Sequence, residues 1–421
     1  MYTRIALLTL SLLLFALPVA AEQVIEVVTF DQLLTEWYGT QGAKFAEANP
    51  GIRVEARTVA GGINGLTDHI TVRLASGNPP DMADNVLRVY YPWADEGYLV
   101  DMLPLLERSS VVSTRDIIPG LPEAKSYRGG LYNAPTSIDP FLTLFDAQMF
   151  EEAGLADPYA LSQSGAWSWA SGLDAAQKLT RTGPDGTVTQ WGWAPGNNSD
   201  WSWLAYVVAN GGRLLSEDFK SVEFTKGPAV EALDWIAQLY NQYEVGRRAY
   251  FQGAPLAMAT GNSGGLKARY TANEQSRISA APIAPPQAGM PSRGTMFADG
   301  PIIFNNGGDA DAAWRFVEWL LGNEAQRSLA DITGRIPGRL DAVSYWAELT
   351  APYIGGAARG HVFSDAASTA SLPPLGPHYN DMMRVINPAV YEIFDGKASA
   401  QSKLEEIAPQ VQAVLDTHFG K

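Results

Sequence analysis

The chain of 421 residues contains no cysteine. This absence excludes disulfide bonds, thiolate metal centres and a cysteine nucleophile. Positive charge is also scarce, because 30 Lys and Arg face 45 Asp and Glu, for a net charge of −15. Nucleic acids and anionic membrane surfaces both favour basic patches, so we expect neither as a partner. The 4 histidines lie far apart without an H-E-x-x-H motif, so we expect no metal site and no cofactor.

Long hydrophobic runs are missing after residue 21, and the one that precedes it is short. It lies behind Arg4, has its core at Ile5–Leu17 and ends in the small residues Val19-Ala20-Ala21. This order predicts a signal peptide over residues 1–21, removed on export to the periplasm. Since no cysteine follows, we expect no lipid anchor. A second membrane anchor would need about 18 further apolar residues in a row, and none is present.

Aromatic residues are abundant, with 12 Trp and 17 Tyr. Several tryptophans come in pairs, such as Trp191/Trp193 and Trp201/Trp203, within segments rich in Gly, Ser and Asn. Such segments are typical of loops. Flat rings flanked by polar groups form the surface that sugar rings prefer. Each ring could instead fill a core, and composition alone leaves both interpretations open.

The first part of the chain alternates strand and helix patterns. A β-branched run at Val24–Phe30 predicts a strand, Leu33–Asn49 a helix, Ile52–Thr58 a second strand and Asp68–Ala75 a second helix. This alternation predicts a parallel α/β sheet, and the length of the chain predicts two domains. Later elements are expected at Phe141–Phe145, Pro255–Thr260 and Ile278–Ala281 (strands) and at Ala147–Ala153, Val230–Tyr243, Ala310–Leu321, Asn323–Ile332 and Val385–Phe419 (helices, the last interrupted at Asp395-Gly396).

A series of short motifs occurs in one order along most of the chain. Together they resemble family 1 extracellular solute-binding proteins, the periplasmic sugar receptors of ABC importers. The motifs are Lys44-Phe45 with Asn49-Pro50-Gly51, Ala75-Ser76-Gly77-Asn78-Pro79-Pro80-Asp81, Asp95-Glu96-Gly97-Tyr98-Leu99-Val100-Asp101, Gly130-Leu131-Tyr132-Asn133-Ala134-Pro135, Trp167-Ser168-Trp169, Asn210-Gly211-Gly212, Phe251-Gln252-Gly253 with Ala257-Met258, and Ala313-Trp314 with Gly334-Arg335-Ile336-Pro337.

The resemblance implies a two-lobe periplasmic-binding-protein fold of class II type. Each lobe would be a mainly parallel sheet flanked by helices. The first lobe would hold residues 22–137 and 299–336, and the second 138–298 and 337–421, joined by a hinge of crossing segments. A ligand bound in the cleft would stabilise a closed state that membrane permease subunits recognise.

In this family, loops at the carboxyl ends of strands line the cleft, as open α/β sheets generally allow. Tryptophan and tyrosine would stack on a sugar, and Asn, Asp and Arg would bind its hydroxyls. A hinge or structural role is the alternative for Asp299 and Arg335. The resemblance therefore implies ligand contacts from Trp37, Tyr38, Asp84, Asn85, Arg88, Ser137, Asp139, Trp191, Trp193, Asn197, Trp201, Asn262, Ser263, Asp299, Arg335, His378 and Tyr379, with Asn380 a weaker candidate.

Two enzymatic interpretations compete with a receptor. Residues 261–265 match G-x-S-x-G, the nucleophile turn of α/β-hydrolases, with Ser263 as nucleophile, Asp299 or Asp365 as acid and His378 or His418 as base. A secreted glycoside hydrolase would need two spaced carboxylates, which no local motif identifies. We expect instead a monomeric, non-catalytic receptor for a mono- or oligosaccharide that serves an ABC permease. Polyols, polyamines and iron are the alternative ligands.

Overall fold

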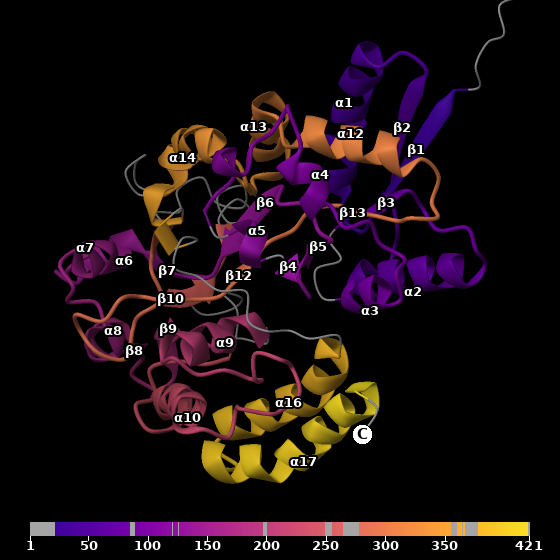
Figure 1. Cartoon of the computed structure of the whole chain (residues 1–421). Coiled ribbons are helices and arrows are strands. Elements are labelled where there is room, and N and C mark those ends of the chain that lie inside the picture. The colour runs from indigo at the N-terminus through magenta and orange to yellow at the C-terminus, as the bar shows by residue number, and fades with distance from the viewer. Residues whose placement is uncertain are drawn as a thin grey trace, which may run out of the picture.

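The computed structural model describes residues 22–84, 89–119, 121–124, 126–196, 200–248, 255–263, 278–354, 360–363, 365–366 and 378–419. Two β-sheets, each flanked by helices, lie in different halves of the molecule, and a small third sheet lies between them (Figure 1). In the described part, no helix is long and apolar enough to span a membrane.

The first sheet has the strand order β13-β3-β1-β2. Its centre is β1 (Gln23–Thr29), which pairs in parallel with β2 (Ile52–Thr58) and β3 (Met82–Ala83), while β13 (Ile302–Ile303) adds an antiparallel strand. The strands β1 and β2 with the helix α1 (Gln32–Ala48) between them confirm the predicted strand–helix–strand pattern. Helix α1 begins after Asp31, whose side chain accepts hydrogen bonds from backbone N–H groups of the first turn. The other helices and strands on this side are α2 (Gly62–Ala75), α3 (Tyr91–Asp95), α4 (Leu103–Glu107), η1 (Thr114–Asp116), α5 (Leu121–Ala124), α12 (Ala310–Leu320) and α13 (Asn323–Thr333), with the hairpin β4 (Ser126–Tyr127) and β5 (Gly130–Leu131). Helix α14 (Leu340–Ile354) contacts both α13 and the second sheet.

The second sheet has the order β11-β7-β10-β9-β8 and is mostly antiparallel. Only β9 (Val188–Ala194) and β10 (Leu256–Gly261) pair in parallel, and β7 (Leu142–Asp146), β8 (Arg181–Thr182) and β11 (Ile278–Ala281) all pair antiparallel. The expectation of a mainly parallel sheet is therefore wrong for this lobe. One cause is the short turn between β8 and β9, which can join only antiparallel neighbours. The helices here are α6 (Ala147–Glu152), α7 (Pro158–Gln163), α8 (Trp169–Leu179), α9 (Asp200–Ala209), α10 (Gly227–Asn241), α16 (Tyr379–Phe394) and α17 (Ala400–Phe419).

The third sheet brings together segments that are far apart in the sequence. Its middle strand β6 (Ser137–Pro140) pairs antiparallel with β12 (Met296–Phe297) on one side and with β14 (Ile336–Pro337) on the other. These strands lie where the hinge crossings were expected. The residue limits of the two lobes stay a prediction.

The paired tryptophans lie in regular elements, so the prediction that they lie in loops is wrong. Trp191 and Trp193 are on β9, and Trp201 and Trp203 are on α9. The Trp193, Trp201 and Trp203 side chains are fully buried. Glycine near these tryptophans leaves space for their large rings rather than making the backbone flexible. A Cβ on Gly172, for example, would lie 2.3 Å from the Trp193 ring. Packing against distant segments outweighs the local composition.

Gly192 gives a test of this packing. A Cβ on Gly192 would lie 2.1 Å from the carbonyl oxygen of Ala176, a backbone atom of α8 that cannot move aside cheaply. We expect Gly192→Ala to lower the free energy of unfolding by about 2–3 kcal/mol, the upper range for overpacking. Chemical denaturation followed by circular dichroism measures the loss. Gly227→Ala is the matched control, because its Cβ would meet only Glu231 Oε1 at 3.6 Å. Equal stability of the two variants would contradict the packing assigned to β9 and α8.

Candidate ligand-binding cleft

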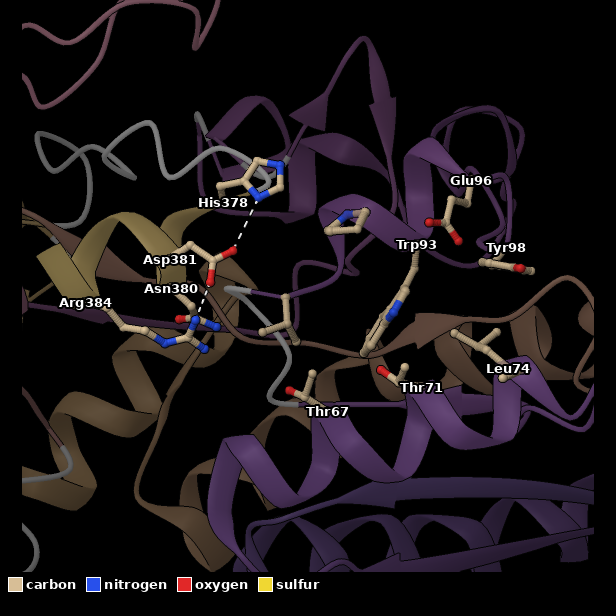
Figure 2. A pocket seen from close by; sticks show the side chains of 13 residues that line it. Thr67, Thr71, Leu74, Trp93, Glu96, Tyr98, His378, Asn380, Asp381 and Arg384 are labelled. Carbon is tan, nitrogen blue, oxygen red and sulfur yellow. Dashed lines mark hydrogen bonds and ion pairs between the residues drawn. The ribbon is translucent and has the colours of Figure 1, made fainter. Parts of the chain in front are cut away.

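A cavity of about 460 Å³ lies between helices of the two halves of the molecule. One wall comes from α2, α3 and the residues that follow α3, and the opposite wall comes from the start of α16 (Figure 2). The lining residues are Thr67, Thr71, Leu74, Ala75, Val89, Pro92, Trp93, Glu96, Tyr98, His378, Asn380, Asp381 and Arg384. A site with walls from both lobes is the arrangement that can sense their separation.

The α2–α3 wall combines an apolar surface with hydroxyl groups. Trp93 is 6% exposed, and its ring lies 5.9 Å from that of Phe304, which fixes its position. In Figure 2 the Trp93 ring lies beside the Thr71 side chain, and Thr67 lies one turn earlier on the same helix. A ring beside hydroxyls can contact both an apolar face and a polar edge of one ligand.

The α16 wall carries a row of ionisable side chains. Asp381 pairs through Oδ1 with the Arg384 guanidinium, and its Oδ2 lies 3.5 Å from His378 Nδ1. The Arg384 side chain is 77% exposed. An ion pair this exposed contributes little to stability, because water competes for both partners. Arg384 can therefore turn part of its donor set toward a ligand.

A second set of polar residues lies beside the crossing strands. Arg335, which precedes β14, pairs with the Asp299 carboxylate and donates to Asp31 Oδ2 at 2.9 Å. Burial alone would lower the pKa of Arg335, but Asp299, Asp31 and Asp84 outweigh it and raise that pKa above its usual range. The guanidinium therefore stays charged and joins the cap of α1 to the crossing segment that holds Asp299.

Tyr38 and Asp84 extend this set into the first lobe. Tyr38 Oη donates to Asp84 Oδ2 at 2.5 Å, and both side chains are buried. Burial, reinforced by the Asp84 carboxylate, raises the pKa of Tyr38 well above its ordinary value. Tyr38 therefore acts as a neutral hydrogen-bond donor throughout the physiological range.

Asp139 on β6 joins the crossing strands to the second lobe. Its Oδ1 accepts from the backbone N–H of Ser263 at 2.7 Å and from Ser263 Oγ at 2.6 Å. Burial raises the pKa of Asp139 to about 6, although both bonds from Ser263 favour the charged form. Ser137 lies on the same strand, and its Oγ donates to the Asp299 carbonyl at 3.2 Å.

The residues expected at the site separate into three groups in the structure. His378 and Asn380 line the cavity. Tyr38, Asp84, Ser137, Asp139, Ser263, Asp299 and Arg335 form the polar set at the crossings, with Asn262 adjacent to Ser263 in the chain. The members of the third group lie in packed cores and do not line this cavity: Trp37 (Nε1 donates to the Ala325 carbonyl), Trp193, Trp201 and Tyr379 (Oη donates to Asp200) are buried, and Trp191 packs near Leu256.

Three expected residues, Asn85, Arg88 and Asn197, lie outside the described residues. Trp93, both threonines of α2, Glu96, Asp381 and Arg384 also line the cavity and were not among the residues expected there. Arg384 had a usable signal, because it lies four residues after Asn380 and so on the same helix face. The α2 and α3 residues had none, since only the tertiary structure sets these helices opposite α16.

The family model for bacterial extracellular solute-binding proteins matches residues 27–327. The chain belongs to this family. Solved structures share the fold across nearly their whole length. The sugar-binding protein MalE from Xanthomonas citri aligns with a TM-score of 0.78 and 18% identity, over 94% of this chain and 98% of that one. A search of curated protein sequences gives no match.

Two further solved relatives have similar coverage. A solute-binding protein of Thermotoga lettingae bound to α-D-tagatose gives a TM-score of 0.74 at 21% identity, over 93% of this chain and 100% of that one. The cyclic α-maltosyl-1,6-maltose-binding protein of Arthrobacter globiformis gives 0.76 at 18% identity, over 94% and 99%. The chain therefore has the two-lobe solute-binding-protein fold, and its cavity lies between the lobes of that fold.

Asp139 predicts how stability depends on pH. Its pKa is higher in the folded chain than the value of about 3.9 for a free Asp, so the protonated form is favoured on folding. The contribution of Asp139 to the free energy of unfolding should therefore fall as pH rises from about 4 to about 6. Asp139→Asn keeps an oxygen for Ser263 and removes the buried charge. We expect it to raise stability at pH 7 by up to about 3 kcal/mol and to flatten that pH dependence.

Urea denaturation between pH 4 and pH 7.5 measures the effect. Asp174→Asn is the control, because the Asp174 side chain is 59% exposed and lies on the surface of α8. The role assigned to Asp139 is wrong if Asp139→Asn leaves the pH profile identical to that of the unmodified chain.

Proposed function

We propose that this solute-binding protein captures a sugar, a mono- or oligosaccharide, in the cavity between its lobes and delivers it unchanged to an ABC importer. One observation carries the proposal: the cavity combines the Trp93 ring and the α2 hydroxyls on one lobe with Asn380 and Arg384 on the other. A sugar ring offers apolar C–H faces and a polar rim, and this set of groups matches both.

The charges of the lining disfavour an anionic guest. Asp381 is paired with Arg384, so this pair contributes little net charge, and Glu96 adds one negative charge to the lining. The whole chain carries a net charge of −15, which disfavours the approach of polyanions. A hydroxyl-rich neutral molecule needs directional hydrogen bonds rather than a countercharge, and Thr67, Thr71 and Asn380 supply them.

The solved relatives support the same ligand class. The Thermotoga protein was solved with a monosaccharide, and the Xanthomonas protein is described as sugar-binding. They are distant in sequence, so the sugar that this chain takes is proposed from its own cavity. Delivery to ABC permease subunits, export to the periplasm after removal of residues 1–21, a monomeric state and the absence of catalysis are part of the proposal.

The hydrolase interpretation receives little support from the geometry. Ser263 Oγ donates to the Asp139 carboxylate, so its hydrogen-bond partner is an acid and not an imidazole base. Asp299, one of the two acids considered for a triad, is engaged by Arg335. His378 lies at the cavity, paired with Asp381. A serine nucleophile needs a base within hydrogen-bond reach. The partner of Ser263 is instead the Asp139 carboxylate, which also accepts the backbone N–H of Ser263.

A thermal-shift screen of the mature chain against sugars, polyols and amines tests the proposal. A ligand at 100-fold excess over its dissociation constant should stabilise the fold by about 2.7 kcal/mol. Chromatography of the recovered ligand should show no product. Stabilisation by polyamines or polyols alone, or turnover of any sugar, would contradict the proposal.

Arg384 supplies the sharpest variant. We expect Arg384→Gln to weaken binding of any sugar found in the screen by about 10-fold or more, because a charge-assisted hydrogen bond across the cavity is lost. Isothermal titration calorimetry measures the affinity. Arg213→Gln is the matched control, since Arg213 is also an exposed arginine in a local ion pair, with Glu217, and lies outside the cavity lining. Equal affinities for the two variants would remove Arg384 from the site.

A further inference from the structure

One carboxylate of the cavity lining lacks a partner in the described part of the chain. The Glu96 side chain is exposed, and no described residue forms a hydrogen bond or an ion pair with its carboxylate. The other carboxylate of the lining, that of Asp381, is paired with Arg384. With His378 neutral, the lining therefore carries one net negative charge, and that charge lies at Glu96.

The turn at the end of α3 places Glu96 between two aromatic residues. Glu96 is the C-cap of α3, and Gly97 follows it with a φ of +75°, a conformation that favours glycine. The N–H of Gly97 donates to the Ala94 carbonyl at 3.0 Å, and the N–H of Tyr98 donates to the Trp93 carbonyl at 2.9 Å. These two bonds are those of the Schellman motif, which brings the chain after the helix back over its last turn. Tyr98 and Trp93 therefore line the cavity together, with Glu96 between them in the chain.

Asn305, two residues after β13, holds this turn in place. Its Nδ2 donates to the carbonyls of Gly97 at 2.9 Å and Leu99 at 3.0 Å, and its own N–H donates to the Tyr98 carbonyl at 2.8 Å. The turn is thereby fixed to the first sheet. Side chains on a fixed turn lose less entropy when they bind a guest than side chains on a mobile loop.

Glu96 and Trp93 combine a negative charge with an aromatic ring on one side of the cavity. They are three residues apart in helical conformation, so they share one face of α3. In Figure 2, these two side chains and Tyr98 lie on one side of the cavity, and Asn380 and Arg384 lie on the other. A carboxylate beside aromatic rings attracts a cation both through its own charge and through the electron-rich ring faces.

The surroundings of Glu96 suit a protonated amine better than a metal ion. A divalent metal needs several protein ligands, and the described residues contain no group of three or more His, Cys, Asp or Glu that could hold one. An ammonium group can bind to a single carboxylate and a ring face. A sugar in which an amine replaces one hydroxyl supplies this group, and its remaining hydroxyls can still bind Thr67, Thr71 and Asn380.

We propose that Glu96, flanked by Trp93 and Tyr98, binds the protonated amine of an amino sugar, so that the cavity prefers amino sugars to the matching neutral sugars. The amine site rests on the proposed function, whose ligand class it narrows. Arg384 on the opposite wall repels the ammonium group and so orients the guest with its amine toward Glu96. The net charge of −15 acts in the same direction, because it attracts cationic solutes.

Isothermal titration calorimetry of the mature chain with matched pairs of sugars tests the preference. The pairs are D-glucosamine with D-glucose, D-galactosamine with D-galactose, and the β-1,4-linked disaccharide of glucosamine with cellobiose. At about pH 7, we expect at least one amino sugar to bind about 5-fold or more tightly than its neutral partner, the gain for a hydrogen bond to a charged group. This ratio should fall as sodium chloride is raised from about 0.02 M to about 0.5 M, because salt screens an exposed pair of charges.

Glu96→Gln tests the residue itself. Glutamine keeps the size of the side chain and a carbonyl acceptor but removes the charge, so the ratio of the two affinities should fall to about 1. Glu107→Gln is the matched control, because Glu107 is the exposed last residue of α4 in the same lobe and lies outside the cavity lining. This control should keep the ratio of the unmodified chain.

Equal or tighter binding of the neutral member of every pair would overturn the amine site and leave the proposed function standing. A preference for amino sugars that survives Glu96→Gln would overturn it too, as would a thermal-shift screen in which only sugars without an amine bind. If no sugar of either kind binds, the proposed function fails, and the amine site fails with it.

Discussion

The β-ladder between the two lobes runs through one short strand in the described part of the chain. Only four residues of β6 carry the ladder to both neighbours, through Ile138 and Ser137 to β14 and through Pro140 and Asp139 to β12. Pro140 has no N–H to donate, so the ladder cannot be strong at that end. A connection of this size sets the position of the axis about which the lobes rotate, but it does not set the angle of that rotation. The energy that separates open from closed must come from contacts elsewhere between the lobes.

Polar side chains beside β6 connect the crossing segments to the neighbouring elements of the two lobes. Arg335 joins Asp31, at the start of α1, to Asp299 on a crossing segment, and Asp139 receives two hydrogen bonds from Ser263 at the end of β10. Each lobe is thereby tied to its own side of the crossings. These partly buried charges are tolerated because each has a hydrogen-bonding or charged partner, and breaking one pair would leave an uncompensated charge. These bonds connect the residues expected to hold ligand at this point to one another, and their contact with a ligand stays a prediction.

The sequence predicts the local elements well and the tertiary neighbours poorly. β1, α1 and β2 were predicted to within a residue or two, because their residue patterns and the Asn49-Pro50-Gly51 stop are local signals. Trp193 was misplaced because its neighbours, Gly172 on α8 and Met258 on β10, come from distant parts of the chain. For the same reason the cavity residues of α2 and α3 were missed, and no pattern in one helix shows which face meets another lobe.

Capture and release follow from the balance between cavity and hinge. A guest that contacts only Trp93 and the α2 hydroxyls binds the open and closed forms equally well and cannot shift their populations. In the proposed function, Arg384 and Asn380 on the far wall would change this, because their bonds to the same guest would form fully only when the lobes approach. Those bonds must exceed whatever holds the lobes apart. Under this proposal, selectivity would depend on how many donors of α16 a guest reaches while its apolar face stays on Trp93. A molecule too small to span both walls would then enter the cavity without stabilising the closed form.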